Sequence, residues 1–438
     1  MGRLAVRRLS ALPRDERALI LSRATSAIFD EELRRSVAEI VDAVARDGDA
    51  AVSRALARFD AVDCPPKRLR VGPEELERAR AALDPAVVEA IRVGIANIRA
   101  FNEHGVANAS WRAEFAPGLE LGEKTGPIDA AALFIPSGKG SFPSVLMQTG
   151  VPAVVAGVPT IVVLVPPMRG RGLDVDPAVL VVAQELGLEN VFRVNGPAGI
   201  AAAAFGTESI PRVRRVVGPG SPAVTAAQIA VQAYGCSTVM LFGPSESVIL
   251  ADESSDPRIL AADLLNEAEH GLDSASLLIT TSPELVEAVS AKVERQLEGL
   301  PDWRRAFAES SISRFGGAFL ADDLDQAVAF VNEYAPEHLQ LAVRDPDALL
   351  AEIEHAGEIL LGDTPFAAAN FALGVPATLP TGGFARVSSG VTARTFLKTS
   401  SIARCSREAL ARVAPAILAL AEHEGFPAHA RAIRARGL

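Results

Sequence analysis

Cysteine is scarce in this chain: only Cys64, Cys236 and Cys405 occur among its 438 residues. The three are far apart and odd in number, and no CxxC pair is present. The sequence therefore supports neither a disulfide framework nor a zinc finger. We expect all three cysteines to be buried and to serve as small hydrophobic side chains.

An excess of positive charge is also absent. Lysine and arginine total 43 against 54 aspartates and glutamates, which gives a net charge of -11. No basic cluster with interleaved aromatic residues occurs. Because a nucleic-acid partner calls for a basic patch that neutralises phosphates, the composition disfavours such a partner.

Long uninterrupted apolar runs are missing as well. The longest, residues 151–167, contains Pro152 and Pro159 and is too short to cross a membrane. Its second half is typical of a buried parallel strand. The arginines near the N-terminus are followed at once by acids, and no apolar stretch there ends in a small-residue cleavage site. These features predict a soluble, cytoplasmic protein.

The chain does contain alternating strand-like and helical segments. Residues 22–115 repeat apolar positions at helical spacing, and a last helical segment runs from about residue 406 to the end. Between them, the strand-like runs AALFIP, TIVVLVPP, VFRV, RRVVGPG, STVMLF, SVILAD, ASLLITT, AFLADD and HLQLAV are separated by helical segments. This alternation predicts an α/β fold with parallel sheets covered by helices.

One acid–base dipeptide, Glu337-His338, follows Pro336 in the segment NEYAPEHLQL. Histidine's unperturbed pKa of about 6.5 makes it the natural general base near neutral pH, and a neighbouring carboxylate can share its proton. Taken alone, such a charged dipeptide more often lies on a solvated surface loop. Two of the other histidines in the chain, His270 and His429, also stand in motif-like settings, which favours a composite active site.

A second candidate lies in LLNEAEHGLDS, where Glu267 and His270 are three residues apart. At that spacing both side chains project from the same helix face and could chelate a metal, although Glu-x-x-His also recurs by chance. Towards the C-terminus, His423 and His429 flank Glu424, and Gly425 with Pro427 breaks the helix between them. We therefore expect only one of these two histidines to reach a site.

Two serine-containing turns have two interpretations each. In VVGPGS, Ser221 stands where it can cap the helix that begins at Pro222, or contact a ligand. In FGPSES, Ser245 and its neighbours serve either turn geometry or substrate contact. The glycine- and proline-rich loop FIPSGKGSFPS is not the GxGxxG dinucleotide fingerprint, so it serves either as a tight connection or as a ligand loop.

Taken together, the short motifs of this sequence resemble those of the histidinol dehydrogenase family over nearly the whole chain. The ordered set is FIPSGKGSFPSVLM, VPAVVAGV, AFGTESIPRVRRVVGPGS, GPSE, LLNEAEHG, NEYAPEHLQL, ILLGDTPFAAANFALG, LPTGGFAR and EGFPAHARAI. The resemblance implies a zinc-dependent enzyme that oxidises an amino alcohol through an aldehyde to a carboxylate and reduces two NAD. It also implies an intertwined homodimer.

For the fold, we expect two parallel-sheet, incomplete Rossmann-like domains and a C-terminal helical tail exchanged in the dimer. The expected boundaries are an N-terminal arm over residues 1–26, a first domain over 27–131 plus 243–390, a second, cofactor-binding domain over 132–242, and a tail over 391–438.

The resemblance implies catalytic roles for Glu337 and His338. His338 would take the alcohol proton, and Glu337 would activate the water that attacks the aldehyde-level intermediate. The implied metal ligands are Glu267, His270, Asn370 and His429. The family's residues at these positions are Gln, His, Asp and His, so the first and third exchange an amide and a carboxylate. The exchange leaves the ligand charge unchanged, or marks a lost metal.

The implied substrate and cofactor contacts also depart from the family. Glu424, which would receive a substrate amino group, and Ser245 are retained, whereas Pro376-Ala377 replaces an asparagine–histidine pair. At the cofactor positions, Phe134, Gly199 and Ser221 replace a tyrosine, a glutamine and an asparagine. Each lost hydrogen bond would weaken NAD binding by roughly 0.5 to 1.5 kcal/mol.

The leading hypothesis is therefore a metal- and NAD-dependent alcohol dehydrogenase that acts on a small polar alcohol other than histidinol. A true histidinol dehydrogenase with unusual metal ligands is the nearest alternative. A non-catalytic homologue that keeps only the dimer, or an enzyme that uses the base for non-redox chemistry, are the others.

Overall fold

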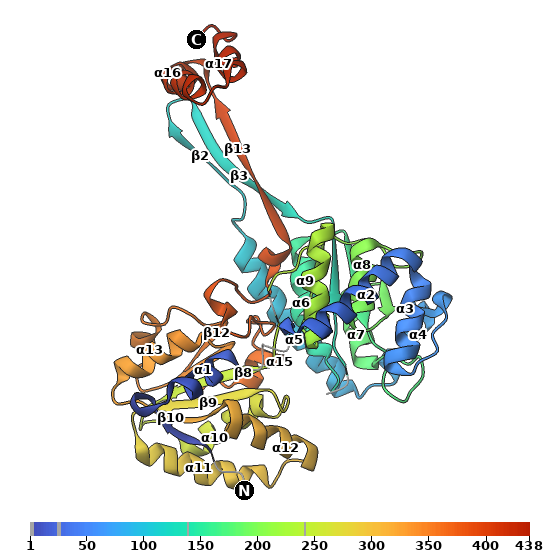
Figure 1. The fold of residues 1–438 in the computed structure, drawn as a ribbon, viewed down its shortest axis with the longest axis vertical. Helices are drawn as coiled ribbons and strands as arrows, with labels where there is room; N and C mark the ends of the chain where they lie inside the picture. Colours follow the sequence, from blue (N-terminus) through green and yellow to red (C-terminus); the bar gives the residue numbers. More distant parts are fainter. Residues whose placement is uncertain (1–3, 24–27, 138–139, 241) are drawn as a thin grey trace.

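The computed structural model describes residues 4–23, 28–137, 140–240 and 242–438. Figure 1 shows two α/β lobes side by side and a long arm that projects from between them and ends in two helices. The expected α/β class with parallel sheets is confirmed. Among the described residues, every helix is too short or too polar to cross a membrane.

The four-stranded lobe is built on a parallel sheet with the order β6-β5-β4-β7. This order matches the first four strands of a doubly wound Rossmann sheet. Its strands are apolar on both faces because helices cover both. The bounds are β4 Ala130–Phe134, β5 Thr160–Val165, β6 Val191–Arg193, β7 Arg215–Val217, α6 Pro143–Ala156, α7 Pro177–Glu185, α8 Gly196–Phe205 and α9 Pro222–Val231.

Helices from residues 31–106 complete this same lobe. Helices α4 and α5 pack with α6 and α7 on one face, and α2 and α3 pack with α8 and α9 on the other. The bounds are α2 Glu31–Asp47, α3 Asp49–Ala55, α4 Pro73–Ala81 and α5 Pro85–Val106. The prediction that residues 27–131 belong with residues 243–390 does not match this packing. An amphipathic helix has an apolar face that fits either sheet, so the sequence pattern did not show which one it covers.

The six-stranded lobe has the parallel order β1-β10-β9-β8-β11-β12. Helices α10, α11, α12 and α15 cover one face, and α1, α13 and α14 cover the other. The bounds are β8 Glu246–Ala251, α10 Pro257–Ala268, β9 Ala275–Thr280, α11 Pro283–Leu297, α12 Asp302–Ser310, β10 Gly317–Leu320, α13 Leu324–Tyr334, β11 His338–Ala342, α14 Pro346–Leu350, β12 Glu358–Leu361 and α15 Phe366–Phe371.

The expected N-terminal arm is part of this lobe in its described residues. Strand β1 (Val6–Arg8) pairs in parallel with β10, and α1 (Arg14–Ser22) places Ile20 in the core. Leu4 and Leu9 are also buried there. Residues 1–3 and 24–26 of the predicted arm lie outside the described part of the chain.

The projecting arm is an antiparallel sheet of three strands in the order β13-β3-β2, and it carries α16 and α17 at its end (Figure 1). The bounds are β2 Trp111–Ala116, β3 Leu119–Pro127, β13 Leu397–Cys405, α16 Arg407–His423 and α17 Pro427–Arg434. The two helices confirm the predicted helical C-terminus. The three strands were not predicted.

Two smaller expectations are corrected by the structure. STVMLF, residues 237–242, does not form a strand in its described residues; only Ser237 makes an isolated bridge, to Arg215. Cys64 and Cys236 are buried as expected, whereas Cys405 is exposed, because it ends a strand of the projecting arm.

Candidate active site

The predicted acid–base pair lies at the amino edge of the six-stranded sheet. Helix α13 ends at Tyr334, Ala335 takes a left-handed conformation (φ 51°), and Pro336 prevents the helix from continuing. The chain turns there and enters β11 at His338. Glu337 and His338 are 8% and 3% exposed, so the alternative of a solvated surface loop is wrong.

The His338 ring is held between two carboxylates. Its Nδ1 contacts Oε1 of Glu358, the first residue of the adjacent strand β12, and its Nε2 lies 3.7 Å from Oε1 of Glu337. The ring of Phe366 meets the imidazole edge-on, with ring centroids 5.8 Å apart. The ring orientation is therefore fixed from three sides.

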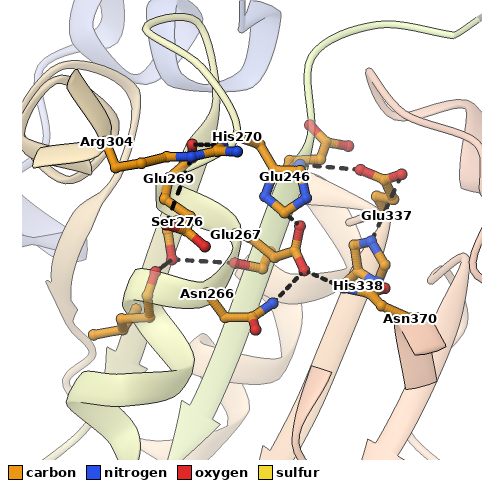
Figure 2. Close-up of polar contacts among 12 residues, drawn as sticks. Glu246, Asn266, Glu267, Glu269, His270, Ser276, Arg304, Glu337, His338 and Asn370 are labelled. Carbon is orange, nitrogen blue, oxygen red and sulfur yellow. Dashed lines mark hydrogen bonds and ion pairs between the residues drawn. The ribbon is translucent and has the colours of Figure 1, made fainter. Parts of the chain in front are cut away.

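Glu337 is anchored through its other oxygen. Oε2 accepts a hydrogen bond of 3.0 Å from the backbone N–H of Glu246, the first residue of β8 (Figure 2). Burial raises the pKa of Glu337 to about 8, although the His338 imidazole acts against the shift. A carboxyl group with such a pKa can accept and release a proton near neutral pH.

The protonation of His338 is decided by the carboxylates around it. Burial by itself lowers the pKa of an imidazole, but here nearby negative charge outweighs burial and raises the pKa to about 10. The contributing carboxylates are those of Glu337, Glu267 and Glu358. The Glu337 carboxyl and the His338 ring are therefore both protonated at neutral pH when no other group is bound.

Three of the four expected metal ligands come together beside this pair. Glu267 lies in the last turn of α10, and its Oε1 accepts hydrogen bonds from Nδ2 of Asn370 (2.8 Å) and of Asn266 (2.7 Å) (Figure 2). Nδ1 of His270 lies 3.4 Å from Oε2 of Glu267. Burial opposes ionisation of Glu267, but the imidazoles of His270 and His338 and the two amides lower its pKa below the usual value.

This donor set fits part of a zinc site. Zinc takes carboxylate and imidazole ligands, and the buried Nδ1 of His270 has no hydrogen-bond partner in the described structure. Within the described residues, however, no group of three or more His, Cys, Asp or Glu side chains could hold a metal ion. Asn370 directs its amide N–H, which cannot bind a metal, towards Glu267. One chain alone therefore supplies two strong metal donors, Glu267 and His270.

The fourth expected ligand and the expected amine-binding residue lie elsewhere. His429 is in α17 and Glu424 directly follows α16, so both are at the far end of the projecting arm and exposed (Figure 1). The ring of His429 contacts that of Phe426 in the same arm, with ring centroids 5.0 Å apart. Within one chain these two residues are not part of the site.

The remaining expected substrate contacts are Ser245, which precedes β8, and Ala377, which lies where the two lobes meet. Ser245 directly precedes Glu246 and accepts a backbone hydrogen bond from Ala275 (3.0 Å). The backbone N–H of Ala377 donates to Oε1 of Gln148 in the four-stranded lobe (3.3 Å), while Nε2 of Gln148 donates to the carbonyl of Val375 (3.2 Å). Gln148 thus links the two lobes beside Pro376-Ala377, the segment that replaces the family's asparagine–histidine pair.

The expected cofactor residues gather at the carboxyl edge of the four-stranded sheet. Phe134 ends β4, Gly199 lies in the first turn of α8, and Ser221 precedes α9. Strands β4 and β7 flank the point where the strand order reverses, the usual place for a ligand in such sheets. Phe134 is buried in the core (1% exposed), and Ser221 is at the N-cap position without a side-chain capping bond.

A buried ion pair that the sequence reasoning missed supports the site. Arg23 forms an ion pair with Glu246, and its guanidinium lies 3.7 Å from the ring centroid of Tyr334. Oε1 of Glu246 also accepts from the backbone N–H of Gly382 (3.0 Å). Glu246 and Glu358 were both overlooked. Each is an acid that opens an otherwise apolar strand, and that break in the pattern is the signal that could have identified them.

Comparisons with known proteins agree with this architecture. Residues 23–437 match the family model described as histidinol dehydrogenase. The histidinol dehydrogenase of Synechocystis sp. is 42% identical over 400 residues, which cover 91% of each chain. A histidinol dehydrogenase homolog of Colwellia psychrerythraea is 38% identical over 98% of this chain and 96% of its own.

A solved structure is similar over the whole chain. The crystal structure of histidinol dehydrogenase from Elizabethkingia anophelis has a TM-score of 0.93 at 30% identity and covers 100% of this chain and 98% of its own. Fold, site and likeness together define the class as a two-lobed α/β NAD-dependent dehydrogenase. The chain belongs to the histidinol dehydrogenase family.

Proposed function

We propose that this protein oxidises a small polar amino alcohol to the carboxylate, through the aldehyde, at the Glu337–His338 pair. The observation that carries the proposal is the buried imidazole of His338, whose Nε2 faces Glu337 while its Nδ1 is occupied by Glu358. Such a ring has one nitrogen available to exchange a proton with a substrate.

In the first step, His338 removes the hydroxyl proton as the C–H bond breaks and a C=O bond forms. Bound NAD supplies the hydride acceptor. In the second step, Glu337 takes a proton from the water that adds to the aldehyde, and a second C–H bond of the resulting hydrate breaks to give the acid. Each oxidation therefore releases one proton to this pair and one hydride to a separate NAD.

The cofactor is expected at the carboxyl edge of β4 and β7, between Phe134, Gly199 and Ser221. Because the Phe134 ring is buried, we expect the backbone that follows it to form this part of the site, together with the amino ends of α8 and α9. The exposed hydroxyl of Ser221 has no capping bond and is available to a ligand.

Zinc would be held by Glu267, His270 and Asn370 of one chain and by His429 of a second copy. It would polarise the substrate oxygen. Asn370 must then turn its carbonyl oxygen, in place of its N–H, towards the centre. The reciprocal exchange of amide and carboxylate at Glu267 and Asn370 supports a ligand set of unchanged charge.

The position of the arm supports a second copy of the chain. Helices α16 and α17 carry Glu424 and His429 away from the lobes of their own chain (Figure 1), so we infer a homodimer in which each arm reaches the other subunit's site. Glu424 would then receive the substrate's amino group. Ala377 offers no side-chain hydrogen bond at the position of the family's histidine, which supports a substrate other than histidinol.

The test is NADH formation by purified, zinc-loaded protein from histidinol and from a series of amino alcohols without an imidazole. We expect turnover of a member of that series, weak or no turnover of histidinol, and loss of the rate in the His338→Gln variant. Turnover of histidinol alone would identify a histidinol dehydrogenase with unusual ligands. If the protein neither binds NAD nor oxidises any of these alcohols, it is a non-catalytic homologue.

A further inference from the structure

One carboxylate beside the His338 imidazole takes no direct part in the proton and hydride transfers of the proposed reaction. Glu358 is the first residue of β12, and in the parallel ladder it is the direct register partner of His338 in β11. Because register partners on neighbouring strands project to the same face of a sheet, the two side chains are brought together by the strand pairing itself. No loop conformation is needed to hold them.

The two side chains are also withdrawn from solvent. Their side chains are 4% exposed for His338 and 5% for Glu358, and Oε1 of Glu358 is the atom that meets Nδ1. The second oxygen, Oε2, is buried without a hydrogen-bond partner in the described structure. The carboxylate therefore has one polar side-chain contact among the described residues, and it is the imidazole.

A buried carboxylate with a single partner needs a reason, because burying a charge costs free energy that a well-packed apolar residue would not. The opposite ring nitrogen, Nε2, faces Glu337 at 3.7 Å, on the side where Glu267 and His270 also lie (Figure 2). Glu358 thus contacts Nδ1, the ring nitrogen that points away from Glu337.

We propose that Glu358 is a positioning residue that keeps a proton on Nδ1 of His338, so that Nε2 is the nitrogen that exchanges protons in the site. The inference rests on the proposed dehydrogenase function for its kinetic consequence, but the proton position on the ring is a property of the resting protein. A carboxylate can only accept from Nδ1–H, and this fixes both the tautomer and the ring plane.

The first test is nuclear magnetic resonance of protein labelled with nitrogen-15 in histidine, at a pH above the titration of the ring. His338 is assigned by its absence from the spectrum of His338→Gln. We expect the neutral ring to carry its proton on Nδ1. In Glu358→Gln an amide can donate as well as accept, so we expect a mixture of tautomers. A proton on Nε2 in the unmodified protein overturns the proposal, whether or not the variant folds.

The second test is kinetic. We expect Glu358→Gln to lower kcat about 10- to 100-fold, the range seen when a group that orients a functional histidine is removed, with KM nearly unchanged. The matched control is Glu287→Gln, the same change at an exposed position of α11. Equal kcat values in the two variants contradict the proposal.

The two tests separate this inference from the proposed function. If no alcohol is oxidised, the kinetic test is void and the dehydrogenase proposal fails, while the spectrum of the resting protein still decides the position of the proton. If oxidation is found and the proton is on Nε2, the dehydrogenase proposal stands and the role of Glu358 falls.

Discussion

Buried carboxyl groups surround the imidazole of His338 and decide its protonation. Glu337 and His338 were expected as a pair, and the structure places them together in a buried position. Their supports, Glu246 and Glu358, come from strands 91 and 20 residues away in the chain. Such a contact depends on strand order and register, which a single sequence does not specify. The pair and its neighbours Glu267, His270 and Asn370 were therefore predictable, whereas the carboxylates that support the pair were not.

The raised pKa values at the pair predict an alkaline activity profile. A base must be unprotonated to act, whereas the carboxyl of Glu337, with a pKa near 8, and the ring of His338, with a pKa near 10, hold protons at pH 7. We expect kcat/KM for the alcohol to rise as the pH increases from 7 through 8 and beyond. Initial rates at saturating NAD measure this. A profile that falls over the same range would refute the assignment.

Asp263, in α10 near the site, predicts a stabilising substitution. Burial raises its pKa to about 6, Gln340 lowers it and Asp363 raises it. A carboxyl whose folded pKa exceeds its unfolded value stabilises the fold below the unfolded value and loses that contribution as the pH rises through the folded one. Asp263→Asn removes this cost at pH 7, and its amide can donate to Oε1 of Gln340, which has no partner in the described structure.

We expect Asp263→Asn to raise the free energy of unfolding at pH 7 by about 1 to 2 kcal/mol, and by less at pH 4. Urea denaturation at both pH values measures the difference. Asp63→Asn, the same change at an exposed position, is the control and should leave stability unchanged. A variant with no pH-dependent gain would mean that Asp263 is not destabilising in the folded protein.

At the scale of elements, most of the parallel strands and many of their helices could be predicted, whereas β1, β12 and the strands of the arm could not. The strands of the two lobes are mostly apolar runs because helices bury both of their faces. Strands β2 and β13 are mostly exposed along their length and carry charges such as Glu114 and Arg404. Without a buried face there is no apolar alternation, so the usual signal for a strand is absent.

One buried arginine joins several elements of the four-stranded lobe. Arg193, at the end of β6, is fully buried and donates to the carbonyls of Arg68, Arg70 and Leu173, and it pairs with Glu75 of α4. Removing it leaves these acceptors without their donor. We expect Arg193→Leu to lower the free energy of unfolding by about 3 kcal/mol or more.

Urea denaturation measures this loss, and Arg214→Leu is the matched control. Arg214 is a half-exposed arginine whose ion pair with Asp129 spans 3.6 Å, so its loss should cost less than about 1 kcal/mol. Similar losses in the two variants would show that the buried contacts of Arg193 add nothing to the stability of the lobe.

For the whole molecule, the distance between the lobes and the tip of the arm predicts complementation between subunits. If each site uses His338 from one chain and His429 from the other, neither His338→Gln nor His429→Gln is active alone. A hybrid dimer of the two variants contains one site with both histidines intact. Random mixing gives half hybrids with one such site each, so we expect about a quarter of the unmodified activity.

The measurement is NADH formation after the two variants are denatured and refolded together, with each variant refolded separately as the control. NADH formation returns in the mixture only if the arm of one subunit supplies His429 to the site of the other. Mixtures that stay inactive, while the unmodified protein recovers after the same treatment, would show that His429 does not act across a dimer.

The pairing of β1 with β10 has a consequence for the order in which the chain folds during synthesis. Val6 is in register with Ala318, so the first strand must wait for more than three hundred residues before its neighbour exists. At about 5 to 20 residues per second, that wait is roughly 15 to 60 s. Most of the four-stranded lobe, residues 28–240, has by then left the ribosome, but Val391, Ala393 and Phe396 of its core are made later still. The first strand to emerge is thus among the last to pair, and it does so beside a neighbouring lobe that still lacks its last core residues.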